Sequence, residues 1–307
     1  MQVINYQVEF GINIFKMNEQ ETSSNSSSIV RKGIDSHQHF WKYDAVRDIW
    51  ITDDMNVIQR DFLLQDLKPH LIKNNFEGCV AVQADQSENE TDFLLQLAKE
   101  DSFIKGIVGW VDLQSDNLNE RLSYYKTFGA IKGFRHILQA EKDEAFMLTP
   151  NFMKGIAALA NFDFTYDILV YSNQLKHVPE FVAKFPNQKF VLDHLGKPAI
   201  KNGFSDSWVK DIVSIAQHDN VYCKLSGMVT EADWKHWKKE DFTPYLDVVV
   251  EAFGTGNIMF GSDWPVCHLS ASYERTLQIV TDYFSTFSMN EQDKVFRNNA
   301  VSFYNLD

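Results

Sequence analysis

Short apolar stretches recur along the chain from Gly33 onward, and each of them ends in a polar or charged residue. Each stretch is followed by a segment whose apolar residues recur at roughly helical spacing, a pattern typical of strands that alternate with helices. We predict eight strands of this kind, at residues 33–40, 78–84, 106–113, 131–136, 164–170, 189–194, 221–227 and 257–263.

The segments between these strands indicate helices. They include residues 90–100, 150–162, 178–185, 206–218 and 243–253. Parallel strands joined by helical crossovers form either a closed barrel or a doubly wound open sheet. A doubly wound nucleotide-binding sheet has a glycine-rich turn after its first strand, whereas His37 and His39 stand there in this chain. The number of strands and the chain length therefore favour an α/β fold of the (β/α)8 TIM-barrel type over residues 33–307.

The chain begins with a segment, residues 1–32, that precedes the first predicted strand and forms an N-terminal extension in this interpretation. Residues 18–29 are polar and rich in Ser and Asn, so we expect a mobile tail, and Met17 is a second candidate for the first residue. The first 16 residues lack the features of a secretory signal, and no run approaches the ~20 apolar residues of a membrane span. We therefore expect a cytoplasmic protein that does not bind a membrane.

Charge and cysteine usage narrow the classes of partner. The formal net charge is −13 and no stretch is rich in Lys and Arg, which disfavours nucleic acid as a ligand. Cys79, Cys223 and Cys267 lie far apart inside apolar runs and predict buried, reduced thiols. A small molecule is therefore the expected partner, and a homo-oligomer is compatible with the sequence.

Three residues at the ends of the first and last strands indicate a metal site. His37 and His39 are two apart on a strand, so both imidazoles project from the same face toward the mouth of the barrel. Asp263 ends strand eight, which neighbours strand one in a closed barrel. Two imidazoles and one carboxylate can bind zinc or a similar divalent ion and leave a position for water. Taken alone, the two histidines could simply be polar residues at a strand end, and Asp263 could cap a helix.

Other polar residues stand at the same end of further strands. His194 ends strand six in VLDHLGKP, where a core histidine is the alternative, and Arg135 and His136 end strand four in GFRH. A guanidinium there could hold a substrate carbonyl or hydroxyl groups, or it could pair with a buried acid. We therefore take Asp263, His194 and Arg135 as candidate catalytic residues and His136 as a candidate for substrate binding.

Two tryptophans complete the candidate substrate site. Trp41 and Trp264 flank the proposed metal ligands and could stack on a sugar ring. The other tryptophans of interest, which we expect in the core, are Trp50, Trp110 and Trp234. Lys224 is unusual inside an apolar strand, and Glu231 and Asp233 follow strand seven, so these three are secondary candidates.

Seven separated motifs resemble one known family. They are IDSHQHFW, VAVQA, VGWVDL, GFRH, FVLDHLGKP, KLSGMVTEADW and FGSDWPVC, and they occur in this order. The chain is similar, from about Gly33 to the C-terminus, to the amidohydrolase-related sugar-lactone hydrolases, the family of L-fuconolactonase and L-rhamnonolactonase. The resemblance implies a metal-dependent-hydrolase type of barrel and hydrolysis of an aldonolactone at His37, His39, His194 and Asp263.

The resemblance also sets the expected metal content. Members of the wider superfamily with two metals use a carbamylated lysine at the end of strand four and a histidine at the end of strand five. This chain has Arg135 at the first position and no histidine in YDILVYS at the second. We therefore expect one divalent metal ion, zinc, or none.

These residues predict a mechanism. Asp263 takes a proton from water, which attacks the lactone carbonyl, while a divalent ion on His37 and His39, with His194 or Arg135, stabilises the oxyanion. One alternative is a decarboxylase of an aromatic or unsaturated acid, because related barrels with a similar frame do lyase chemistry. Another is a sugar-binding barrel without turnover. The identity of the sugar lactone stays open, because loop geometry determines which hydroxyl stereochemistry is accepted.

Overall fold

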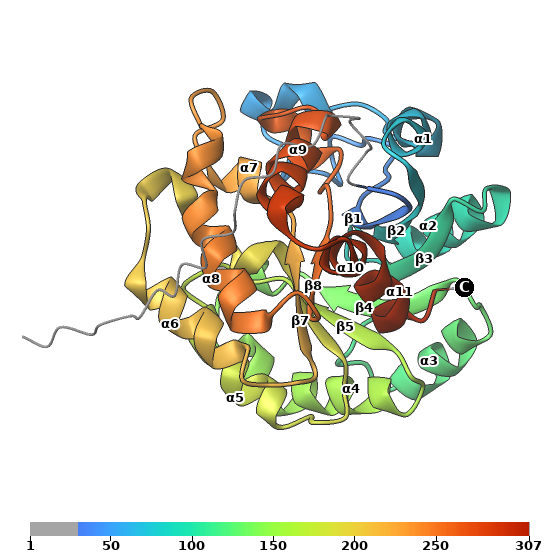
Figure 1. The fold of residues 1–307 in the computed structure, drawn as a ribbon. Coiled ribbons are helices and arrows are strands. Elements are labelled where there is room, and N and C mark those ends of the chain that lie inside the picture. Colours follow the sequence, from blue (N-terminus) through green and yellow to red (C-terminus); the bar gives the residue numbers. More distant parts are fainter. Residues whose placement is uncertain (1–29, 307) are drawn as a thin grey trace, which may run out of the picture.

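A sheet of eight parallel strands forms the centre of the computed structural model, which describes residues 30–306 (Figure 1). Each strand pairs with the next one in the chain, from β1 to β8. The strands are Gly33–Gln38 (β1), Phe76–Val82 (β2), Ile104–Gly109 (β3), Ile131–His136 (β4), Thr165–Ile168 (β5), Phe190–Leu192 (β6), Val221–Leu225 (β7) and Ile258–Phe260 (β8). All eight predicted strands are present, and the predicted (β/α)8 barrel is confirmed.

The first and last strands meet and nearly close the barrel. Gln38 forms a parallel bridge with Trp264, and the Ser36 hydroxyl donates to the Phe260 carbonyl oxygen over 2.7 Å. The Asp263 amide donates to the His37 carbonyl oxygen over 2.8 Å. The backbone itself therefore holds Asp263 beside the HxH pair, as the strand order predicted.

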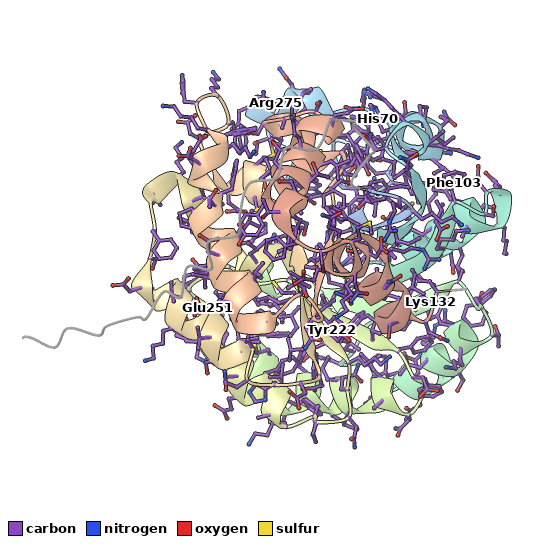
Figure 2. The ribbon with its side chains drawn as sticks, viewed as in Figure 1. His70, Phe103, Lys132, Tyr222, Glu251 and Arg275 are labelled. Carbon is purple, nitrogen blue, oxygen red and sulfur yellow. The ribbon has the colours of Figure 1, made fainter. Side chains whose placement is uncertain are left out.

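Helices surround the strands. The longer α-helices are Leu64–Lys73 (α1), Glu88–Glu100 (α2), Leu118–Lys126 (α3), Pro150–Ala160 (α4), Val178–Ala183 (α5), Asp206–Ile215 (α6), Thr243–Phe253 (α8), Tyr273–Tyr283 (α9), Met289–Asp293 (α10) and Asn299–Tyr304 (α11). A short helix, Met228–Glu231 (α7), follows β7. Several of them begin at a serine whose side chain accepts a backbone N–H, among them Ser87 and Ser205. The side chains in Figure 2 show the polar outside of this ring, where Glu251 of α8 is exposed.

The two ends of the barrel differ. At the N-terminal end, Phe303, Tyr304 and Leu306 pack against inward-facing residues of the strands, namely Ile34, Val80, Val108, Val191 and Met259. Helix α11 therefore lies across this end in Figure 1. The polar strand ends gather at the opposite, C-terminal end, where active sites lie in barrels of this kind.

The first described residues already belong to the folded part. Val30 is buried in the hydrophobic core, and Arg31 pairs with Asp293. Val30 and Arg31, the first described residues of the predicted extension 1–32, therefore contact the barrel, whereas the predicted mobile tail and the Met17 start lie outside the described residues. Among residues 30–306, no helix is long and apolar enough to cross a membrane.

Candidate active site

The predicted metal ligands converge at the C-terminal end of the barrel. The Nε2 atoms of His37 and His39 lie 3.2 Å apart, and Asp263 Oδ1 lies 3.4 Å from His39 Nε2 and 3.8 Å from His37 Nε2. Two ligand atoms at about 2.0–2.1 Å from a tetrahedral zinc ion are separated by about 3.3 Å. The three groups therefore fit a divalent ion without rearrangement.

Hydrogen bonds on the far side of each imidazole orient the two histidines. His39 Nδ1 lies 2.8 Å from the Val82 carbonyl oxygen, which can only accept, so His39 carries its proton on Nδ1 and presents the Nε2 lone pair to the site. His37 Nδ1 lies 3.2 Å from Asp193 Oδ1, which can accept its proton, and 3.1 Å from Lys224 Nζ, which can only donate. The lone pair of His39 Nε2 therefore points at the position that an ion would take, and His37 presents the lone pair of Nε2 there when its Nδ1 proton is donated to Asp193.

Burial and charge set the protonation states of these groups. Burial lowers the pKa of both His37 and His194 well below the ordinary value, so both imidazoles are neutral near pH 7. Burial alone would raise the pKa of Asp263, but His194 and His39 lower it below its ordinary value. An ionised carboxylate beside neutral imidazoles can bind a cation or accept a proton from water.

Strained turns place two of these residues. Asp263 and His194 both have a positive φ of 55°. In the turn after β6, left-handed backbone continues through Lys197, which directs the His194 ring to the site. Gly227 packs against that ring, and a Cβ atom there would lie 2.5 Å from His194 Nδ1. Only glycine fits between β7 and the ring.

A buried ionic cluster lies beneath His37 and consists of Arg135, Asp167, Asp193, Lys224 and Tyr304. Lys224 Nζ lies 3.0 Å from Asp193 Oδ1 and also pairs with Asp167, and Arg135 Nη1 lies 3.0 Å from Asp193 Oδ2. The Tyr304 hydroxyl donates to Asp167 Oδ2 over 2.8 Å. Burial alone would raise the pKa of Asp193, but Lys224 and His37 lower it well below its ordinary value. The two cations thus compensate the two carboxylates.

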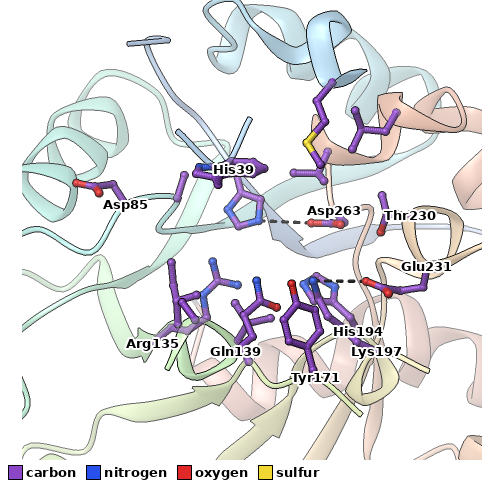
Figure 3. Close-up of a pocket in the computed structure, with 18 of the residues that line it drawn as sticks. His39, Asp85, Arg135, Gln139, Tyr171, His194, Lys197, Thr230, Glu231 and Asp263 are labelled. Atoms are coloured by element: carbon purple, nitrogen blue, oxygen red, sulfur yellow. Dashed lines mark ion pairs between the residues drawn. The ribbon is translucent and has the colours of Figure 1, made fainter. Parts of the chain in front are cut away.

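The ligand group opens into a cavity of about 590 Å³. His39, Asp263, His194 and Arg135 form part of its wall, together with polar side chains such as Gln139 (Figure 3). The other lining residues are Trp50, Met55, Ala84, Asp85, Gln86, Ile137, Ala140, Leu169, Tyr171, Lys197, Thr230, Glu231, Trp234, Val266 and Leu269. This volume is in the range of cavities that bind small molecules.

Three residues predicted to bind substrate, Trp41, His136 and Trp264, do not line this cavity. Trp41 and Trp264 are each only 1% exposed, and both pack edge-to-face on Phe62 in the core. His136 does not line the cavity, because its Nε2 lies 2.7 Å from Glu141 Oε1 and its ring stacks on Phe146. Trp41 follows the HxH motif and Trp264 follows Asp263 in the sequence, but neither side chain lines the cavity.

The sequence did not identify several side chains that do line the cavity. Trp50 and Trp234, which we expected in the core, provide its aromatic surface. Lys197, which the sequence did not single out either, forms an ion pair of 3.5 Å with Glu231, one of the secondary candidates. Lys197 follows the end of β6, so the signal that indicated Glu231 after β7 could also have found Lys197, whereas the two tryptophans lie in long loops that no periodic pattern describes.

An HxH pair and an aspartate at the mouth of a (β/α)8 barrel are the features of a class of barrel hydrolases, and this protein has both. The chain belongs to the amidohydrolase family, whose model matches residues 34–306. It is similar to the L-fucono-1,5-lactonase of Burkholderia multivorans, with 39% identity over 284 residues that cover 89% of this chain and 96% of that protein. The L-fucono-1,5-lactonase of Burkholderia ambifaria is 33% identical over 285 residues, covering 89% and 96%.

A solved structure that is similar to this chain contains zinc. The crystal structure of an amidohydrolase from Burkholderia multivorans with bound zinc is 39% identical, has a TM-score of 0.87, and covers 90% of this chain and 99% of that one. In the part of this chain that the structure describes, His37, His39 and Asp263 can hold a divalent ion.

Proposed function

We propose that this protein hydrolyses a sugar lactone, such as L-fuconolactone or L-rhamnonolactone, to the aldonic acid. The observation that carries the proposal is the ionised Asp263 carboxylate, which lies 3.4 Å from His39 Nε2 in the wall of a small-molecule cavity. The similarity to two L-fucono-1,5-lactonases over nearly their whole length supports the same chemistry.

Asp263 is the general base of the proposed reaction. Its depressed pKa keeps the carboxylate ionised near pH 7, so it can take a proton from a water molecule in the cavity. That water then attacks the carbonyl carbon of the lactone. His194 Nδ1 bonds to Ser226 Oγ at 2.9 Å, which leaves Nε2 as the nitrogen that can contact the substrate. Arg135 is fixed by Asp193 and by the Gln83 carbonyl oxygen and can stabilise the developing oxyanion.

A single zinc ion is the proposed cofactor. Bound by His37, His39 and Asp263, a divalent ion would act as a Lewis acid that polarises the lactone carbonyl. A second group of possible ligands is formed by His37, Asp193 and His194. Asp193, however, is already neutralised by Lys224 and Arg135, which disfavours another cation there.

The charges of the cavity favour a neutral polyhydroxy substrate. Its two basic side chains already pair with acids, Arg135 with Asp193 and Lys197 with Glu231. Neither is available as the sole partner of a substrate carboxylate, which a decarboxylase has to bind. The aromatic surface of Trp50 and Trp234 suits stacking on a sugar ring. The convergent ligand group also argues against a binding protein without turnover.

A panel of aldonolactones tests the proposal. Acid release, followed with a pH indicator, should be fast with at least one of the fucono, rhamnono and galactono lactones. Carbon dioxide release from aromatic acids, measured on the same preparation, should stay at background, and metal content should approach one ion per chain. Release of carbon dioxide without lactone opening would overturn the proposal in favour of a decarboxylase.

A further inference from the structure

An ion pair between Lys197 and Glu231 lies in the wall of the cavity, and the proposed reaction gives it no role. Lys197 Nζ lies 3.5 Å from Glu231 Oε1, and about four-fifths of each side chain is buried. Figure 3 shows Glu231 projecting into the same cavity as Asp263. Charged groups that are largely removed from water need hydrogen-bond partners, because an unsatisfied buried charge costs free energy. A bound ligand could supply such partners to this pair.

The pair uses little of its hydrogen-bonding capacity. An ammonium group can donate several hydrogen bonds, and a carboxylate can accept several. Among residues 30–306, neither charged group has another hydrogen-bond or ion-pair partner. Gln139 also lines the cavity, and its buried Oε1 atom has no hydrogen-bond partner within the same residues. This part of the wall therefore offers both donors and acceptors to a molecule in the cavity.

The fold holds the two charged groups in place. Lys197 ends the left-handed turn after β6, and its Nζ lies 5.3 Å from the centroid of the Tyr171 ring, within the range of a cation–π contact. Glu231 ends helix α7. Trp234 Nε1 donates to the Thr230 carbonyl oxygen over 2.9 Å, which fixes this indole close to Glu231. The ion pair and an aromatic ring are thus positioned together at one part of the wall.

We propose that Lys197 and Glu231 bind two adjacent hydroxyl groups of the sugar lactone and so determine which lactones are accepted. This assignment rests on the proposed lactonase function and deepens it. Glu231 accepts a hydrogen bond from each hydroxyl group, and Lys197 donates to one of the two hydroxyl oxygens. Because the two charges of the pair compensate each other, the subsite suits a neutral diol. The lactone carbonyl stays beside Asp263 and Arg135, as in the proposed reaction.

δ-Valerolactone, a lactone ring without hydroxyl groups, provides the first test. Glu231→Gln should raise the KM for the aldonolactone by about 10–100-fold and change kcat by less than about threefold, because hydrogen bonds to a charged group are lost from the bound substrate. The kcat/KM for δ-valerolactone should change by less than about threefold, because this ring has no hydroxyl group to bind. The matched control is Glu251→Gln on the exposed outer face of α8, which should affect neither lactone (Figure 2).

Monodeoxy versions of the same aldonolactone locate the diol. With the wild type, removal of the hydroxyl group at each of two adjacent carbons should lower kcat/KM by about 10–100-fold, because a charged group then loses its partner. Glu231→Gln should no longer distinguish these two monodeoxy lactones from the parent. Lys197→Met should lose the discrimination at one of the two carbons.

The outcomes separate the role of the pair from the proposed function. A loss confined to kcat, an equal loss on the aldonolactone and δ-valerolactone, or unchanged discrimination among the monodeoxy lactones overturns the role of the pair. Aldonolactone turnover by the wild type would still support the proposed function. If δ-valerolactone opens too slowly to follow, its inhibition constant against the aldonolactone replaces kcat/KM and should be the same in wild type and Glu231→Gln. If the wild type opens no aldonolactone, the proposed function fails and the diol subsite fails with it.

Discussion

The cavity and the buried ionic cluster meet at Arg135, and both contain carboxylates. In the cluster, Asp167 and Asp193 are fully buried and are compensated by Lys224 and Arg135. In the cavity, Asp263 stands beside neutral imidazoles and borders open space. A carboxylate whose charge is already compensated contributes to the structure, whereas one that still needs a cation or a proton is available for chemistry.

Asp263→Asn should have the largest effect of these substitutions, and it should lower activity without lowering stability. The amide is nearly isosteric but cannot take a proton from water, so lactone turnover should fall by about 10³-fold or more. The backbone bond between Asp263 and His37 is unaffected, so the thermal midpoint should change little. Steady-state kinetics and a thermal melt on the same sample check both points. Wild-type turnover in a folded variant would remove Asp263 from the mechanism.

Lys224→Met should show the converse behaviour, a loss of stability. The substitution leaves Asp167 without its cation and Asp193 with only Arg135, and removing one partner of a buried ion pair costs about 3–5 kcal/mol. Urea unfolding measures this loss. Lys239→Met is the matched control, because its pair with Asp282 is exposed and should contribute less than about 1 kcal/mol. Equal stability of the two variants would show that the cluster is not a structural element.

Trp41 and Trp50 extend this comparison between a buried and a cavity-lining group to aromatic side chains. Trp41 is buried beside Phe62, so Trp41→Ala should lower the unfolding free energy by about 3 kcal/mol or more. Trp50 is 40% exposed and lines the cavity, so Trp50→Ala should mainly raise the KM for the lactone, by about tenfold. If Trp41→Ala raised KM as strongly as Trp50→Ala while remaining stable, our revision of the substrate site would be wrong.

Glu90 is a buried carboxyl group that forms no ion pair with another described residue, so it shows the effect of burial on stability. Burial raises its pKa from 4.5 to about 7, and its Oε1 accepts the Ala84 amide proton at the cavity wall. Because the folded pKa lies above the unfolded one, folding is penalised as the pH rises from about 4.5 to 7, and the penalty is constant above that. Glu90→Gln should therefore be more stable than wild type by about 2 kcal/mol at pH 8 and should lose this advantage at pH 4. A pH-independent difference in unfolding free energy would contradict this explanation.

The strand pattern was sufficient to predict the barrel and the end of it that carries the site. Parallel strands buried on both faces appear as short apolar runs, and the residue after each run lies at the C-terminal end. The contact between His39 and Asp263 followed from this, because an eight-stranded barrel places β8 next to β1. The same reasoning could not place Trp41 or Trp264, since a side chain's direction in a loop depends on packing that the sequence pattern does not describe.

The sequence by itself determined the strand order, the positions of the three candidate metal ligands and the family resemblance, because these depend on local periodicity and on residues at fixed places in each strand. The tertiary structure alone decided that Lys224 compensates two carboxylates, that Glu231 shares a cavity with Asp263, and which tryptophans face that cavity. Charges and rings separated by many residues are brought together by packing, and their burial sets their pKa values. The chemistry of this site therefore depends on distances between side chains that cannot be derived from the spacing of residues in the sequence.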